Sequence, residues 1–217
     1  MRDEKLEGLD QLIGLIGARL NQPRLIVALA GPPGAGKSTI ASILRQRCVD
    51  ELGTSAEIVP MDGFHLDDQV LRARDLLTRK GAENTFDVDG LIALLRRIRT
   101  NVEDEIAAPL FDRALELSRA GALIIPRQTR IVIVEGNYLL LDRERWAALR
   151  GLFDISVRIR APQGVLRRRL VDRWISFGLP DEEITSKVEG NDLPNGDLIE
   201  TSSVVPDLWL DWVVQDR

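Results

Sequence analysis

The residues best suited to chemistry form a glycine-rich run behind the first strongly apolar segment. The run reads Gly31-Pro32-Pro33-Gly34-Ala35-Gly36-Lys37-Ser38-Thr39. It fits G-x-x-x-x-G-K-[ST], whose glycines let backbone N–H groups turn inward and hold phosphate oxygens at a helix N-terminus. We expect Lys37 to reach the β- and γ-phosphates and the Ser38 hydroxyl to ligate Mg²⁺. Residues 31–39 therefore predict a site for a nucleoside triphosphate.

Two carboxylates follow apolar segments elsewhere in the chain. Asp62 comes after Glu57–Pro60, and Glu135 comes at the end of Arg130–Glu135. If both segments are strands of one parallel sheet, their carboxyl ends lie at the edge where ligands bind. We expect Glu135 to order Mg²⁺ or its waters, and Asp62 to accept a proton from a substrate hydroxyl.

The composition excludes several other chemistries. The chain has 217 residues, one Cys and one His, and a formal net charge of −5. A single Cys cannot form an internal disulfide, and zinc fingers, iron–sulfur clusters and multi-His metal sites need more Cys and His than the chain has. The single His65 lies next to Phe64, where it could contact substrate, although a hydrogen bond to the backbone is nearly as good an explanation.

The elements that must position these residues alternate between strands and helices. Short runs rich in Val and Ile predict five strands, at 25–30, 57–60, 130–135, 155–160 and 208–214. Helical patterns occupy 4–20, 37–52, 67–80, 88–100, 143–150, 163–177 and 181–189. This alternation predicts one α/β domain over residues 1–217 with the P-loop NTPase fold, a five-stranded parallel sheet and helices on both faces. Residues 1–22 form its N-terminal helix, and the insertion 62–129 is expected to be largely helical.

An arginine-rich helix follows the fourth predicted strand. Arg169 and Arg173 lie four residues apart and so share one face of the helix at 163–177. Such a pair suits a lid over residues 161–190 that closes on the nucleotide and stabilises charge on the transferring phosphoryl group. A solvated basic face is the alternative, and it is the better explanation for Arg167 and Arg168.

Several short blocks together resemble a known group of enzymes. They include the glycine-rich loop, Met61-Asp62-Gly63-Phe64-His65, Thr85-Phe86-Asp87, Ala108–Arg113 and Gly190–Asn195. Their order and spacing look like the uridine kinase, phosphoribulokinase and pantothenate kinase superfamily of P-loop kinases. The greatest similarity is to its bacterial branch of nucleoside/nucleotide kinase-like proteins, also labelled fructose transport system kinases.

The resemblance implies roles for further residues. Asp62 matches the acid that activates the acceptor hydroxyl, and Asp87 matches an acid that grips substrate hydroxyls in the uridine kinase branch. Phe111, Asp112 and Arg113 fall where that branch has a Tyr-Asp-Phe segment lining the acceptor pocket. The change from Tyr to Phe111 argues against a pyrimidine nucleoside, whereas the two further acids favour a neutral polyhydroxylated acceptor.

We therefore expect a kinase that uses ATP and Mg²⁺ to phosphorylate a hydroxyl of a small metabolite such as a nucleoside, a sugar or a pantothenate-like alcohol. The alternatives are a P-loop regulatory ATPase or switch that acts on a protein partner, and a nucleotide-binding module without catalysis. The acidic N-terminal segment and the lack of a long apolar run predict a cytoplasmic protein that binds neither membrane nor nucleic acid. The oligomeric state stays open, with a homodimer as the commonest assembly of soluble proteins.

Overall fold

A parallel sheet of short apolar strands forms the centre of the fold. In the computed structural model, which describes residues 4–212, five strands pair in the order β2-β5-β1-β6-β7. All four pairings are parallel, so the carboxyl ends of the strands share one edge. The predicted α/β P-loop NTPase fold is confirmed, and Val213 and Val214 of the last predicted strand lie outside the described residues. The strands are β1 (Leu25–Ala30), β2 (Ala56–Pro60), β5 (Ile131–Gly136), β6 (Ile155–Arg160) and β7 (Leu208–Asp211).

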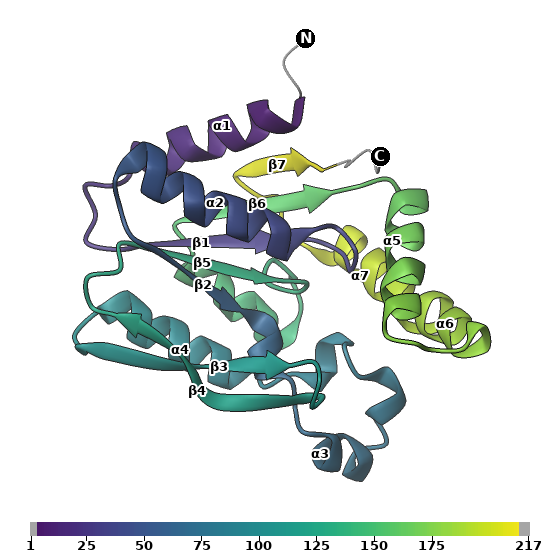
Figure 1. Cartoon of the computed structure of the whole chain (residues 1–217). Coiled ribbons are helices and arrows are strands. Elements are labelled where there is room, and N and C mark those ends of the chain that lie inside the picture. Colours follow the sequence, from purple (N-terminus) through teal and green to yellow (C-terminus); the bar gives the residue numbers. More distant parts are fainter. Residues whose placement is uncertain (1–3, 213–217) are drawn as a thin grey trace.

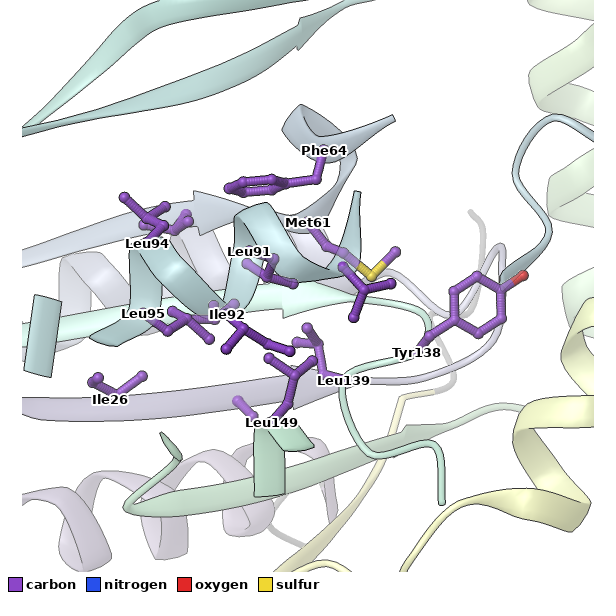
Figure 2. Close-up of a cluster of buried hydrophobic side chains, with 14 of the residues drawn as sticks. Ile26, Met61, Phe64, Leu91, Ile92, Leu94, Leu95, Tyr138, Leu139 and Leu149 are labelled. Atoms are coloured by element: carbon purple, nitrogen blue, oxygen red, sulfur yellow. The ribbon is translucent and has the colours of Figure 1, made fainter. Parts of the chain in front are cut away.

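Helices cover both faces of this sheet, because alternate side chains of each strand point to opposite faces. Leu25, Val27 and Leu29 pack with α1 (Glu4–Gly17) and α2 (Lys37–Leu52) on one face. The next residues along β1 face α4 (Val88–Thr100) on the other side. Figure 1 shows the two layers above and below the sheet, and Figure 2 shows the core between the sheet and α4.

The insertion between β2 and β5 contains a long β-hairpin, so the expectation of a largely helical insertion is wrong. Strand β3 (Glu105–Asp112) pairs antiparallel with β4 (Leu117–Pro126). Pro109 sits inside β3, where the pairing register shifts between Ala108 and Leu110. Pro109 within β3 and Gly121 within β4 are poor strand signals, and the irregular pairing around Pro109 is what accommodates the proline.

The rest of the insertion consists of short helical turns. These are η1 (Met61–Phe64), α3 (Asp68–Ala73), η2 (Leu77–Arg79) and η3 (Glu83–Thr85). The single helix predicted over 67–80 is wrong, because Asp75 has a φ of 55°, which interrupts the helix after α3. Such a left-handed residue cannot continue a right-handed helix.

Helices beyond β6 gather near the carboxyl ends of the strands, as Figure 1 shows for α5 and α6. They are α5 (Gln163–Ser176), α6 (Asp181–Lys187), one π-helical turn η5 (Val188–Asp192) and α7 (Leu193–Ser202), while η4 (Glu144–Leu152) precedes β6. The stretch 190–205, for which no element was predicted, thus continues the helices of the lid region. No helix in residues 4–212 is long and apolar enough to cross a membrane.

Candidate active site

The glycine-rich loop connects β1 to α2 as its spacing predicts. Gly34 and Gly36 have φ values of 78° and 90°, in the left-handed region that favours glycine. A Cβ at Gly36 would lie 3.0 Å from the Trp212 ring, so a larger residue would also crowd the loop. With α2 beginning at Lys37, the loop presents its amides at a helix N-terminus, which suits a phosphate group.

Lys37 points back across this loop. Its Nζ donates hydrogen bonds to the carbonyl oxygens of Gly31 and Pro32, at 3.1 and 3.0 Å. Burial lowers the pKa of the Lys37 ammonium group, while the carboxylates of Glu135 and Asp62 act in the opposite direction. A cation that has lost much of its hydration at this place gains strongly from a phosphate ligand.

Ser38 and Glu135 meet at the carboxyl end of β5. The Ser38 hydroxyl donates to Glu135 Oε1 at 3.0 Å, although the residues are 97 positions apart. Burial raises the pKa of the Glu135 carboxyl group, and the neighbouring Lys37 opposes that shift. Hydroxyl and carboxylate oxygens are the ligands that Mg²⁺ prefers, and a Mg²⁺ site typically takes only one or two protein ligands beside phosphates and waters. This donor pair therefore fits the predicted metal.

Asp62 lies on η1, directly beyond β2, and forms an ion pair that the sequence did not predict. Arg113 Nη2 donates to Asp62 Oδ2 at 2.5 Å. The hairpin can approach this closely because residue 63 is glycine: a Cβ there would lie 2.4 Å from the carbonyl oxygen of Pro109. The insertion thus brings Arg113 against the carboxylate that follows β2.

Three aromatic rings form a wall beside Asp62. The His65 ring lies 4.2 Å from that of Phe86 and 4.7 Å from that of Phe111, measured between centroids. His65 Nδ1 is 2.8 Å from the backbone oxygen of Asp62. A carbonyl oxygen can only accept, so Nδ1 carries the proton and the neutral ring has Nε2 as an acceptor. Burial lowers the pKa of His65, which keeps the ring neutral near pH 7.

The two predicted lid arginines have different surroundings. Arg173 lines the cavity described below, with its guanidinium 5.2 Å from the ring centroid of Trp174. Arg169 Nη1 donates to the carbonyl oxygen of Gly34 at 3.2 Å, so it contacts the backbone of the glycine-rich loop. Burial lowers the pKa of Arg173, and the positive charge of Arg113 adds to this effect. Only Arg173 of the pair faces the open space of the site.

One cavity of about 280 Å³ gathers most of the predicted site. It lies at the carboxyl edge of the sheet, between the glycine-rich loop, the hairpin and the lid helices. Of the predicted residues, its lining includes Pro33, Gly34, Gly36, Lys37, Ser38, Thr39, Asp62, His65, Phe111, Arg113, Glu135 and Arg173. Gly31, Pro32 and Ala35 are buried within the loop itself, beneath this surface.

Two predicted substrate residues instead stabilise backbone turns. Asp87 is the N-cap of α4, and its Oδ1 accepts from the Gly90 amide at 2.9 Å. Asp112 Oδ1 accepts from the amides of Ala114 and Leu115 in the hairpin turn. Neither residue is in the lining of this cavity. Asp commonly caps helices and turns, so both residues have a local structural role, and their contact with substrate stays a prediction.

The cavity lining also includes residues that the sequence did not predict. Lys80 and Thr78 come from the turns after α3, and Lys187, Asn191 and Asp192 come from the lid region. Asn191 Nδ2 donates to the backbone oxygen of Lys80 at 3.0 Å and so connects the lid region to the insertion. Its block, Gly190–Asn195, had been singled out by the resemblance, but no spacing rule could place it across the cavity.

Comparisons with known proteins agree with this geometry. A family model described as an AAA domain matches residues 27–189. A Schizosaccharomyces pombe protein named "Putative uridine kinase" is 36% identical over 200 residues, which cover 88% of this chain and 84% of that protein. A Myxococcus xanthus pantothenate kinase is 31% identical over 171 residues, covering 75% of this chain and 53% of that enzyme. The crystal structure of a "putative fructose transport system kinase" from Silicibacter sp. TM1040 matches with 41% identity and a TM-score of 0.87, covering 94% of this chain and 98% of that one.

The fold and the glycine-rich loop thus define an ATP-binding P-loop protein. The chain belongs to the uridine kinase, phosphoribulokinase and pantothenate kinase group of P-loop kinases, as its sequence pattern predicted.

Proposed function

We propose that this kinase transfers the γ-phosphoryl group of ATP to a hydroxyl group of a small metabolite, in a reaction that requires Mg²⁺. The observation that carries the proposal is the shared cavity, whose lining combines the phosphate-binding loop with Asp62, Glu135 and Arg173. Residues 1–217 would act as one kinase unit, with 62–129 as the insertion that binds the acceptor and 161–190 as the lid.

Asp62 supplies the base of the proposed reaction. Its carboxylate accepts the proton of the acceptor hydroxyl while that oxygen forms a bond to the γ-phosphorus. The bond from the γ-phosphorus to the bridging oxygen of ADP breaks at the same time, and ADP leaves with the electron pair. The products are ADP, the phosphorylated acceptor and a protonated Asp62, which returns its proton to water.

The remaining residues hold and neutralise the phosphates. The loop amides and Lys37 bind phosphate oxygens, and Arg173 supplies positive charge from the lid side of the cavity. Ser38 and Glu135 would hold Mg²⁺, which when bound neutralises charge on the phosphates. The aromatic wall that includes His65 and Phe111 lines the acceptor side and keeps water from the reacting oxygen.

The test is an ADP-release assay on the full chain with ATP and Mg²⁺ against a panel of sugars, sugar phosphates, hydroxy acids, nucleosides and vitamins. Asp62→Asn should lower turnover of the accepted alcohol by about 100-fold or more, the usual contribution of a general base. Its affinity for ATP, measured by calorimetry, should change little, because Asp62 belongs to the acceptor side.

Asp89→Asn is the matched control, because Asp89 lies on the exposed surface of α4 and pairs there with Arg145. An exposed ion pair contributes little to stability, so this variant should fold and turn over like the unaltered chain. Wild-type turnover in Asp62→Asn would refute the assignment of the base. ATP hydrolysis that responds to a protein and to no alcohol of the panel would instead favour the regulatory ATPase.

A further inference from the structure

The proposed base already has a partner. Asp62 Oδ2 accepts from Arg113 at 2.5 Å, and the two side chains are 30% and 44% exposed. An acceptor hydroxyl must form its own hydrogen bond with this carboxylate before it can lose its proton. A hydroxyl that approaches Asp62 therefore finds one of the two carboxylate oxygens already occupied by a guanidinium group, which stands beside the other oxygen.

A second cation stands on the same wall. Lys80 Nζ lies 5.1 Å and the Arg113 guanidinium 5.6 Å from the ring centroid of Phe111. Lys80 also bonds to Asp68 at 2.7 Å and to the backbone oxygen of Glu116 at 2.8 Å, with the Glu116 carboxylate at 3.4 Å. Several protein partners thus fix the position of the Lys80 ammonium group. The Arg113 guanidinium, in contrast, is bonded to a single carboxylate of the cavity, that of Asp62. Both cations come from the insertion, on the acceptor side of the site.

We propose, on the basis of the proposed function, that the acceptor carries an anionic group, a carboxylate or a phosphate, and that Arg113 is the specificity-determining residue that binds it. The anion takes the place of Asp62 as partner of the guanidinium, and Asp62 becomes free for the hydroxyl. A neutral alcohol offers Arg113 no such partner, so the ion pair would persist. Because Arg113 and Asp62 are 2.5 Å apart, the anion must lie within a few bonds of the reacting hydroxyl.

The structure also gives little support to the expectation of a neutral polyol. That expectation depended on Asp87 and Asp112 as acceptors for several substrate hydroxyls. Both carboxylates are used by backbone amides, at 2.9 and 3.1 Å, and neither lines the cavity. What the acceptor wall offers instead is a guanidinium, a group whose planar donors match a carboxylate or phosphate.

The test compares alcohols that differ only in the anion. Suitable pairs are glycerate with glycerol, pantothenate with panthenol, and ribose 5-phosphate with ribose. In the ADP-release assay with the full chain, the anionic member of at least one pair should have the higher kcat/KM. Whether a carboxylate or a phosphate pair responds tells which anion is bound. Calorimetric titration with the same acids and phosphates measures binding without turnover.

Variants of Arg113 then assign the effect. Arg113→Gln should lower kcat/KM for the anionic alcohol by about 10- to 100-fold, as loss of hydrogen bonds to a charged group implies. Arg113→Lys keeps the charge and should retain part of this activity. Arg119→Gln is the matched control: it lies on the same hairpin, pairs with Asp112 and is 56% exposed, and it should behave like the unaltered chain.

The outcomes separate this proposal from the proposed function. Efficient turnover of neutral alcohols alone would overturn the anionic acceptor and leave the kinase function in place. An equal loss in Arg113→Gln for both members of a pair, or a matching loss of acceptor-free ATP hydrolysis, would place Arg113 at the transferring phosphoryl group instead. If no alcohol of the panel is phosphorylated and no acid or phosphate binds in an Arg113-dependent manner, both proposals fail.

Discussion

Arg24 offers the sharpest test of how the insertion is held to the sheet. Its side chain precedes β1, is 5% exposed and has no ion pair with any carboxylate among the described residues. The guanidinium instead donates to the backbone oxygens of Thr129, Ile98, Pro126 and Arg127, at 2.8, 3.2, 2.9 and 3.0 Å. These carbonyls belong to the end of α4, to the last residue of β4 and to the segment between β4 and β5, so one side chain holds both ends of the hairpin region.

Replacing Arg24 by Met would remove these four hydrogen bonds while keeping much of the apolar stem. At about 1 kcal/mol net for each bond, the free energy of unfolding should fall by about 3 to 5 kcal/mol. For a chain of this length, such a loss corresponds to a Tm lower by roughly 6 to 20 °C. Arg24→Lys has only one nitrogen to donate from and should recover about half of the loss.

Urea and thermal unfolding, followed by circular dichroism, measure these differences. Arg145→Met is the matched control, because Arg145 is 70% exposed and pairs with Asp89 on the surface. Surface ion pairs contribute about 0 to 1 kcal/mol, so this variant should unfold almost like the unaltered chain. A loss below about 1 kcal/mol in Arg24→Met would refute the conclusion that this arginine fastens the insertion.

Two further predictions concern the metal ligands and the single cysteine. Ser38→Ala should raise the Mg²⁺ concentration needed for half-maximal turnover about tenfold or more, because one oxygen ligand is lost. Ser42→Ala, on the exposed side of α2, is its control, and an unchanged Mg²⁺ requirement in Ser38→Ala would contradict the assignment. Burial raises the pKa of the Cys48 thiol from 9.0 to about 11, so the folded chain should resist alkylation by iodoacetamide at pH 9. The thiol of the unfolded chain ionises at a lower pH than the buried thiol. The stability that burial of the protonated Cys48 contributes is therefore present below pH 9 and is lost as the pH rises towards 11. Rapid alkylation of the folded protein at pH 9 would show that Cys48 is accessible.

The sequence alone determined the features that depend on neighbouring residues. The loop at residues 31–39 is a contiguous pattern whose glycines, lysine and serine each have a local reason for their place. The central strands β1 and β5 are buried on both faces, so they appear as apolar runs that can be recognised without knowing their partners. Asp62 and Glu135 could be assigned to one edge of the sheet because parallel strands bring their carboxyl ends together.

Only the tertiary structure decided the features that depend on residues far apart in the chain. Arg113 reaches Asp62 across 51 positions because a hairpin with irregular pairing at Pro109 folds over η1, and no spacing rule describes that contact. Asp87 and Asp112 have the side chain a substrate site would need, yet one oxygen of each accepts from nearby backbone amides and neither residue lines the cavity. Local hydrogen bonds form at little entropic cost, whereas a long-range contact exists only once the whole fold brings its partners together. The phosphate-binding loop could therefore be predicted from contiguous residues alone. On the acceptor side the sequence pointed to Asp62, His65, Phe111 and Arg113, which line the cavity, but only the tertiary structure decided their contacts.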